Sequence, residues 1–457
     1  MIFGRTISFY LYLSTMAAFI LSATLPPMAA PDEPAHLFKA EALAEGHLVG
    51  KPIGEKRGNG IDAGVIRLFL NVDDVTSVAP ATPEVRRRLR ETAWVGQLGD
   101  AVFSNTAQYG PIFYLPQALA LKAGRLSGLS VLAAYEVART IAALTAIALG
   151  AIALTLVTRG RLLFLIVLLL PMSLFLLASI GQEGILIAVS ALCAATASRI
   201  RSNDESTGHS VVWLGLACAI GLAMARPPLA LLSLLLVSPK TVTTTWRRWC
   251  LSPRGALAPL VVATMTAGWL ALSGSVGARI STDPAVDQHA QLISLLADPL
   301  RVVPIAVATV SNDFLNLAMQ AVGVLGWLKI TLPGWAYDWG WASLGLATLS
   351  LVVEPGGPSL KRAAIVWCVI GMTAGTLSLA TYLSWTPVGG SQVEGLQGRY
   401  FIPLFFLIPL AIPSLSIPAN WARFLRIPFT AVSLIFVSAI TVRMLTDIHG
   451  IFAWGSG

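Results

Sequence analysis

The sequence predicts an all-α polytopic membrane protein with about eleven transmembrane helices, in a range of roughly nine to thirteen. Hydrophobic residues make up 55% of the chain and charged residues only 12%, whereas a typical soluble domain carries about 25% charged residues. Apolar runs long enough to cross a bilayer recur along the sequence, unlike the short alternating segments of a β-barrel. We therefore expect residues 1–457 to form a single integral membrane domain, with the lipid bilayer as its partner.

The positive charge of the chain also fits a membrane protein. The formal net charge is +8, and the basic residues cluster in short loops between apolar runs. Membrane proteins concentrate Lys and Arg in cytoplasmic loops in this way, so we expect no nucleic-acid partner. The four cysteines are widely spaced and have no metal-binding pattern, which is typical of small residues in a hydrophobic core.

The first apolar segment covers residues 7–27 and follows Arg5. It predicts an uncleaved transmembrane helix, and a cleaved signal peptide is the alternative because the segment ends in MAA. Residues 28–130 then predict the first extracytoplasmic loop, since most of this stretch is too polar for hydrocarbon. Within the loop, residues 111–126 are interrupted by proline and carry two basic residues, so we expect a juxtamembrane helix there rather than a span.

The rest of the chain alternates apolar runs with short loops. Further spans are expected near residues 131–157, 162–180, 184–199, 211–225, 227–239, 257–274, 336–353, 363–384, 400–416 and 427–446. Residues 275–334 predict a second extracytoplasmic region with an interfacial helix at about 300–325. This order places the basic stretches 199–201, 246–249 and 361–362 in the cytoplasm, as the positive-inside rule requires.

With this topology, the unusual polar stretches all lie where a span meets the extracytoplasmic face. They are Asp32 to His36, Asn105 to Tyr114, Gln182-Glu183, Arg226-Pro227-Pro228, Gly326 to Pro333 and Gln397 to Tyr400. Carboxylates and arginines that converge at one membrane face predict an active site at that face.

Asp32, Glu33 and His36 are the candidate catalytic residues. Pro34 suits the first turn of a helix, and this helix would lie along the membrane surface with both acids at its start. A carboxylate there could act as a general base, because desolvation at the membrane boundary raises its pKa towards a useful value. Two alternatives stay open: the acids only cap the helix, or the three residues bind a divalent cation such as Mg²⁺ or Mn²⁺.

Arg226 and Arg399 are the candidate phosphate ligands, because an arginine near the membrane needs a partner and its guanidinium suits phosphate. Snorkelling of these side chains to the interface is the alternative. Glu183 would pair with an arginine or orient a substrate. Tyr400, beside Arg399, is either a substrate contact or an aromatic-belt residue, and Gln397 belongs to the same stretch.

Several stretches, taken together and in order, resemble a bacterial membrane-protein family catalogued as domain of unknown function 2142. These stretches are DEPAH after the first span, YGPIFYLPQAL, LPMSLFLLASIGQEG, GWLKITLP and LQGRYFIPLFF, and the resemblance covers roughly residues 20–415. That family in turn resembles the GT-C superfamily of integral membrane glycosyltransferases, which carry an acidic pair in the first external loop and use polyprenyl-phosphate-linked sugars as donors. Asp32 and Glu33 match this acidic pair, and His36 matches the family's histidine.

The resemblance implies a GT-C-like fold and the transfer of a sugar from polyprenyl phosphate to a glycan, lipid or protein acceptor. The reaction would invert the sugar and take place on the extracytoplasmic face of the bacterial inner membrane. Asp32 would be the base, while Glu33 and His36 would position the acceptor. The segment with Tyr109 and Tyr114, followed by Arg139, matches the corresponding part of these enzymes and supplies further candidate substrate contacts.

Two positions depart from the expected pattern, since Glu183 stands where we expect Asp and Lys329 stands where we expect an acid. The second departure reverses the charge and points to a different acceptor. Two other classes of function remain as alternatives. A transporter or flippase of a lipid-linked saccharide would use the same arginines but needs polar groups at mid-membrane, of which the sequence offers few. A non-catalytic membrane component of polysaccharide export would not depend on Asp32 and Glu33 for activity.

Overall fold

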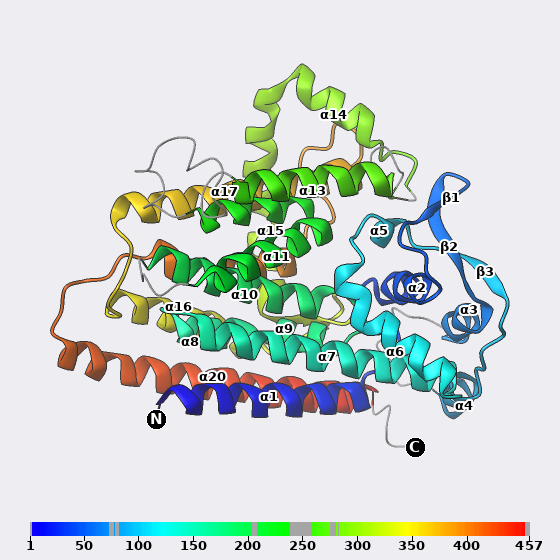
Figure 1. Ribbon diagram of the computed structural model, residues 1–457, viewed down its shortest axis with the longest axis horizontal. Helices are drawn as coiled ribbons and strands as arrows, with labels where there is room; N and C mark the ends of the chain where they lie inside the picture. Colours follow the sequence, from blue (N-terminus) through cyan, green and yellow to red (C-terminus); the bar gives the residue numbers. More distant parts are fainter. Residues whose placement is uncertain are drawn as a thin grey trace.

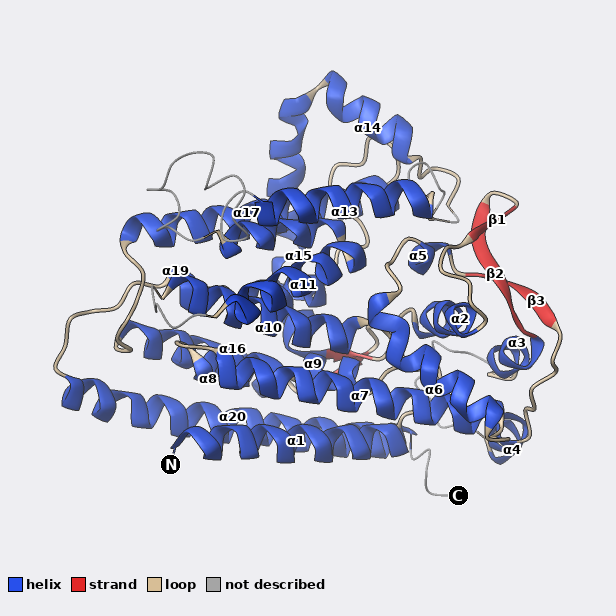
Figure 2. Cartoon of the chain, in the orientation of Figure 1, coloured by secondary structure: helices blue, strands red, loops and turns tan. Residues whose placement is uncertain are grey.

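The computed structural model describes residues 2–72, 77, 82–202, 208–237, 257–274, 280–281 and 283–452. Figure 1 shows an elongated bundle of helices with a smaller region of helices and strands at one end. Helices dominate the described residues, and the few strands are short (Figure 2). The chain is therefore a helical membrane protein, as the sequence predicts.

Six described helices are long and apolar enough to cross a membrane. They are α1 (Ile2–Thr24), α7 (Val131–Leu156), α10 (Glu183–Arg201), α15 (Val302–Gly323), α17 (Leu360–Trp385) and α20 (Ala419–Phe452). In Figure 1, α1, α7 and α20 run in nearly the same direction, and α1 contacts both of the others. Gly150 of α7 allows the close approach of α1, because a Cβ there would collide with the Tyr10 hydroxyl.

Shorter helices complete the bundle. α11 (His209–Ala225), α13 (Leu257–Ser273) and α16 (Gly334–Val352) agree with three of the expected spans in position. A large apolar core runs through the whole bundle and includes side chains from α1, α10 and α20. This core fixes the ends of the helices relative to one another, and those ends carry the polar side chains of interest.

Three expected spans are not single helices. The span expected at 162–180 is divided into α8 (Arg161–Leu168) and α9 (Pro171–Leu177), because Pro171 has no N–H for the helical ladder. Residues 227–236 form the tight 3₁₀ segment η2 (Pro227–Leu236), and 238–239 lie outside the described residues. The span expected at 400–416 begins as η5 (Gly398–Phe401) and continues as α18 (Ile402–Phe405) and α19 (Ile408–Ala411).

The region expected at 275–334 contains more helix than the sequence suggested. α14 (Gln288–Ala297) and the 3₁₀ turn η4 (Pro299–Arg301) lead into α15, and β4 (Val324–Leu325) pairs with β5 (Ile330–Thr331). The helix expected at 300–325 is thus present, and it has the length and composition of a span. α14 and the beginning of α15 project from the bundle at the top of Figure 1. Residues 275–279 and 282, and the basic stretch 246–249, lie outside the described residues.

Residues 33–126, which we call the cap, cover one end of the bundle, on the right in Figure 1. Its helices are α2 (Glu33–Ala44), α3 (Ala63–Leu70), α4 (Pro83–Arg90), α5 (Ser104–Ala107), the 3₁₀ turn η1 (Ile112–Tyr114) and α6 (Leu115–Leu126). The cap also holds an antiparallel sheet that the sequence did not predict, with β2 (Lys56–Asp62) between β1 (Lys51–Ile53) and β3 (Leu98–Val102). Gly58 makes the β2–β3 pairing possible, since any Cβ there would collide with the Ala101 carbonyl.

The basic residues of the short loops gather at the opposite end of the bundle. Arg426 lies 3.4 Å from Glu354, and the charges of Arg201 and Arg362 are close enough to repel each other. The expected loop stretches 199–201 and 361–362 are therefore neighbours at one end, as a shared membrane face requires.

Candidate active site

A cleft of about 180 Å³ lies between the cap and the ends of several bundle helices. Its wall includes Asp32 before α2, Tyr109 after α5 and Glu183 at the start of α10. Arg226, between α11 and η2, and Arg399 with Tyr400 in η5 also belong to its polar lining. Seven of the sequence-predicted candidates, including His36, thus come together although most of them are far apart in the sequence.

Asp32 lies at the entrance of α2 in an unusual conformation. Its φ of 60° is in the left-handed region, which a non-glycine residue adopts rarely and at some cost. This geometry turns the side chain away from the helix, so Asp32 makes no cap hydrogen bond. Instead, its carboxylate accepts from Asn105 Nδ2 at 3.1 Å and from Arg399 Nη2 at 3.0 Å. The side chain keeps 33% of its surface exposed, so a ligand in the cleft can reach it.

Glu33 points away from the cleft, although it is the next residue in the sequence. Its side chain is 1% exposed and accepts hydrogen bonds from the Tyr135 hydroxyl at 2.7 Å and from two backbone amides, Ala30 at 2.9 Å and Ile180 at 3.1 Å. Arg139 lies 3.8 Å away and compensates the charge. Glu33 therefore joins the cap to α7 and α9–α10, and it does not reach an acceptor as the sequence analysis expected.

His36 lies one helical turn beyond Asp32 and is 3% exposed. Its Nδ1 is 2.6 Å from the Tyr114 hydroxyl, and its ring stacks with those of Tyr114 and Tyr109. Burial lowers the pKa of His36 against the opposing effects of Glu183 and Asp32, so the ring is neutral at neutral pH. His36 and Tyr109 both line the cleft, whereas Tyr114 supports His36 from behind.

Arg226 and Glu183 form a buried ion pair in the wall of the cleft. Arg226 Nη2 lies 2.6 Å from Glu183 Oε1, and both side chains are less than one-tenth exposed. The two prolines that follow Arg226 end α11, so its side chain projects from a helix end rather than from a helix face. The pair leaves little net charge at this point, which keeps a buried arginine tolerable.

Arg399 faces Arg226 across Tyr400. The two guanidinium carbons lie 5.5 Å and 4.3 Å, respectively, from the centroid of the Tyr400 ring. Arg399 is 3% exposed, and its Nη2 is bound to Asp32. Burial lowers the pKa of Arg399, but Tyr400, Glu183 and Asp32 together raise it above its ordinary value, so the side chain is charged.

Three N–H groups of these arginines have no hydrogen-bond partner within the part of the chain that the structure describes. They are Nη1 of Arg226 and both Nε and Nη1 of Arg399. A buried donor without a partner costs about 1–3 kcal/mol, and more when it is charged. Two nearly buried guanidinium groups with unused donors, on a shared cleft, are therefore suited to an anionic ligand with several oxygen acceptors.

The candidate metal site does not form. Among the described residues, no three His, Cys, Asp or Glu side chains are arranged to hold a metal ion. Both oxygens of Glu33 are used by the contacts above, and Asp32 faces two cationic or amide donors. Asp32, Glu33 and His36 therefore do not fit a shared divalent cation, and we derive no chemistry from Mg²⁺ or Mn²⁺ here.

Two more predicted substrate contacts lie outside the cleft. Arg139 donates to the Ala178 carbonyl at 2.8 Å and to that of Leu25 at 3.3 Å, so it holds backbone rather than ligand. Gln397 precedes the cleft residues in sequence but does not line the cleft, and its Oε1 has no partner within the described chain.

The sequence analysis missed the contribution of α17. Leu377, Ala380, Thr381, Ser384 and Trp385, all at its end, line the cleft. These positions share one helical face by their spacing of three and four residues, and they include the only hydroxyl residues on that face near the helix end. The sequence signal that could have identified α17 as part of the site is Thr381 and Ser384 near the end of an otherwise apolar helix.

Comparison with known proteins gives one positive result. The family model described as a predicted membrane protein (DUF2142) matches residues 15–408 of the chain. The curated proteins and the solved structures give no match. Since the matched range covers most of the chain, including the cap and every residue of the cleft, the chain belongs to this DUF2142 family of membrane proteins.

Proposed function

We propose that the chain is a membrane glycosyltransferase that transfers a sugar from a polyprenyl-phosphate donor to a cell-envelope acceptor. The observation that carries this proposal is the pair of nearly buried arginines with three unused N–H donors beside the partly exposed carboxylate of Asp32. The arginines suit the phosphate of a donor, and the carboxylate suits the proton of an attacking hydroxyl. The cleft faces the cap, which we assign to the extracytoplasmic side of the bacterial inner membrane.

The proposed reaction is a single displacement at the anomeric carbon of the donor. The acceptor oxygen forms a new bond to this carbon while its proton passes to Asp32, and the bond from the carbon to the phosphate oxygen breaks. The phosphate leaves with the bonding electron pair. Because the acceptor oxygen attacks from the side opposite the phosphate, the configuration at the anomeric carbon is inverted. Arg226 and Arg399 stabilise the charge that grows on the phosphate, which needs no proton to leave.

The ion pair between Asp32 and Arg399 has a place in this reaction. In the absence of a ligand, Arg399 Nη2 lies 3.0 Å from the carboxylate of Asp32 and holds it in place beside the cleft. A donor phosphate would bind the same guanidinium group through its unused Nε and Nη1. Asn105, the other partner of Asp32, would keep the carboxylate oriented towards the acceptor. His36, neutral and bound to Tyr114, forms the wall beside it.

A transporter of a lipid-linked saccharide remains the second candidate, because discontinuous helices often carry transport sites. The breaks at α8–α9 and α18–α19 are the relevant elements. Their residues belong largely to the apolar core, including Leu168, Leu169 and Phe406. They offer no charged side chain at these breaks, and the Ser173 hydroxyl is bound to the Val167 carbonyl, so the enzyme is the better-supported proposal.

Isosteric changes of the two neighbouring acids test the proposal. Cells that lack the gene are expected to lose a sugar from their envelope glycans, as measured by mass spectrometry, and the wild-type gene restores it. Asp32→Asn should reduce transfer by about 10²–10⁴-fold, the range for loss of a general base. Glu33→Gln should lower the amount of folded protein but leave transfer per molecule close to wild type, because Glu33 contacts only structural groups.

Membrane abundance of each variant is measured by immunoblot, so that loss of protein is separated from loss of activity. Full restoration of the sugar by a well-expressed Asp32→Asn variant would remove the base from the mechanism and favour the transporter. If deletion of the gene changes no envelope glycan, the proposal of a glycosyltransferase fails as a whole.

A further inference from the structure

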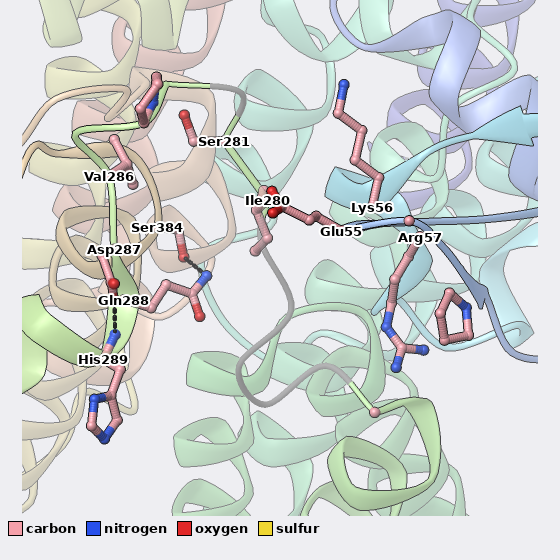
Figure 3. A pocket seen from close by; sticks show the side chains of 14 residues that line it. Glu55, Lys56, Arg57, Ile280, Ser281, Val286, Asp287, Gln288, His289 and Ser384 are labelled. Atoms are coloured by element: carbon pink, nitrogen blue, oxygen red, sulfur yellow. Dashed lines mark hydrogen bonds between the residues drawn. The ribbon is translucent and has the colours of Figure 1, made fainter.

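A second and larger pocket, of about 550 Å³, lies on the outer side of the cleft. We call it the outer pocket. One wall is the β1–β2 hairpin with Glu55, Lys56 and Arg57, and the other is formed by residues 280–281 and 284–289. Figure 3 shows these two walls facing each other, with Ser384 from the end of α17 beside the second wall. Its volume is within the range of about 300–1,000 Å³ that small-molecule sites occupy.

The outer pocket adjoins the cleft. Ile280 and Ser384 line both, and Trp385, the next residue after Ser384, lines the cleft. A molecule seated in the outer pocket can therefore extend past Ser384 towards Asp32 without crossing the hydrophobic core. The described lining residues come from the cap, from the segment before α14 and from α17, so the pocket forms only in the folded chain.

The walls of the outer pocket are held in place by hydrogen bonds to backbone groups. Arg57 Nη1 donates to the carbonyl of Gly50 at 2.6 Å and to that of Ser273 at 2.9 Å. These bonds tie the hairpin to the end of α13. On the other wall, the Asp287 carboxylate accepts from the backbone amides of His289 and Ala290 and fixes the start of α14 (Figure 3).

The lining combines polar with apolar side chains and carries both signs of charge. Lys56 and Arg57 are balanced by Glu55 and Asp287, so a strongly anionic or cationic ligand gains little there. Gln288 Nε2 reaches the Ser384 hydroxyl only at 3.4 Å, a long hydrogen bond that a ligand hydroxyl can replace. Such a mixture of donors and acceptors, set between apolar side chains such as Ile280 and Val286, suits a neutral polyhydroxylated molecule better than a lipid.

From this geometry we infer that the outer pocket binds the acceptor, and that the acceptor is a neutral, water-exposed oligosaccharide. This inference rests on the proposed function for the identity of the reaction, but the binding itself does not depend on transfer. The reacting hydroxyl of the oligosaccharide extends past Ser384 to Asp32, where the donor sugar lies. The remaining sugar units occupy the space between Lys56 and Gln288.

Binding is measured with the purified full-length chain in detergent micelles by saturation-transfer-difference NMR. The probe is the pool of neutral oligosaccharides that mild acid releases from the envelope of cells lacking the gene. Gln288→Trp fills the pocket and should weaken binding by at least about tenfold. Leu292→Trp, an exposed position on the same helix that does not line the pocket, is the matched control and should bind as wild type does.

Lys56→Ala gives a second test on a surface side chain whose loss does not threaten folding, and it should weaken binding to a smaller extent. Inorganic phosphate, titrated into each variant, reports on the cleft and should bind unchanged in all three. The inference is overturned if the wild-type chain binds no oligosaccharide of the pool. Undiminished binding by Gln288→Trp would overturn it equally.

The two proposals fail in different ways. If Gln288→Trp and Lys56→Ala lose the oligosaccharide while Asp32→Asn cells keep their envelope sugar, the outer pocket is a saccharide site and the glycosyltransferase proposal fails. If Asp32→Asn abolishes transfer but the pocket variants bind and transfer normally, the enzyme stands and its acceptor binds elsewhere.

Discussion

A buried arginine lies at each end of the bundle, and the two differ in whether their N–H donors have hydrogen-bond acceptors. At the end away from the cap, Arg159 donates to four backbone carbonyls, those of Leu351, Glu354, Pro409 and Ile412. At the cap end, Arg399 is at least as buried, but its Nε and Nη1 have no partner in the described chain. Every side-chain nitrogen of Arg159 therefore donates to a backbone carbonyl, whereas two side-chain nitrogens of Arg399 have no acceptor in the described chain.

This difference separates structural from functional arginines better than burial or position does. Arg159 joins the loop after α7 to the segments before α17 and after α19, so its partners are all fixed parts of the chain. Arg139 behaves similarly under the cap, where it holds two carbonyls beside Glu33. Unused donors on Arg226 and Arg399 cost free energy in the unliganded protein, and a ligand that satisfies them recovers it.

The largest expected effect is on stability and concerns the saturated arginine. Arg159→Gln should destabilise the protein by about 3–5 kcal/mol, because several buried carbonyls lose their donor at once. The thermal midpoint in detergent, measured by intrinsic fluorescence, should fall clearly. Transfer per folded molecule should stay at the wild-type level. A variant as stable as wild type would mean that water replaces the guanidinium at this end of the bundle.

The next largest effect is on activity and concerns Arg399, two of whose side-chain nitrogens have no hydrogen-bond acceptor in the described chain. Arg399→Gln should reduce transfer by about 10²–10³-fold, the loss expected for one preorganised group that stabilises developing charge. Its stability should change by less than about 1 kcal/mol, because Asp32, its ion-pair partner, is a third exposed. The same assays as for Arg159→Gln then give the reverse pattern. A large loss of stability with normal transfer would place Arg399 with the structural arginines.

A third arginine, Arg125, extends the comparison because it is surrounded by more than one carboxylate. Arg125 of α6 lies 3.7 Å from both Glu41 and Asp62 and is also bound to Glu45. Burial raises the pKa of Glu41 to about 7, Arg125 opposes this rise, and Glu45 and Asp62 add to it. The folded state therefore holds a proton on Glu41 that the unfolded chain releases near pH 4.5.

Stability should accordingly fall as the pH rises from about 4.5 to about 7 and then level off, by at most about 3 kcal/mol for this group. Glu41→Gln keeps the neutral form at every pH and should flatten this part of the curve. Thermal midpoints at pH 5 and pH 8 measure the difference for wild type and variant. An equal pH response of the two proteins would assign the effect to other groups.

Much of the fold follows from the sequence, because length and hydropathy are enough to define spans such as α7 and α17. The broken segments were missed because Pro171 and Pro409 lie inside runs that are apolar throughout, and hydropathy does not register a lost backbone N–H. The sheet of the cap was missed because β2, with the sequence KRGNGID, has none of the alternation that indicates a strand.

The cleft was predictable in part for the same reason. The sequence analysis placed polar residues of several span ends on one membrane face and expected them to converge. Asp32, Glu183, Arg226 and Arg399 do line one cleft. The division of labour between Asp32 and Glu33 was not predictable. It depends on the left-handed backbone at Asp32, which sends two adjacent carboxylates in different directions. No sequence pattern specifies that turn.

The central claim is that Arg226 and Arg399 keep their N–H donors for the phosphate of a lipid-linked sugar. The most direct test is the thermal midpoint of the purified chain with polyprenyl phosphate and with the neutral polyprenol as matched control. Wild type should be stabilised by the phosphate and not by the alcohol, because only the phosphate satisfies the unused donors. The double variant Arg226→Gln/Arg399→Gln should respond to neither lipid. Equal stabilisation of wild type by both lipids, or of the double variant by the phosphate, would contradict the account.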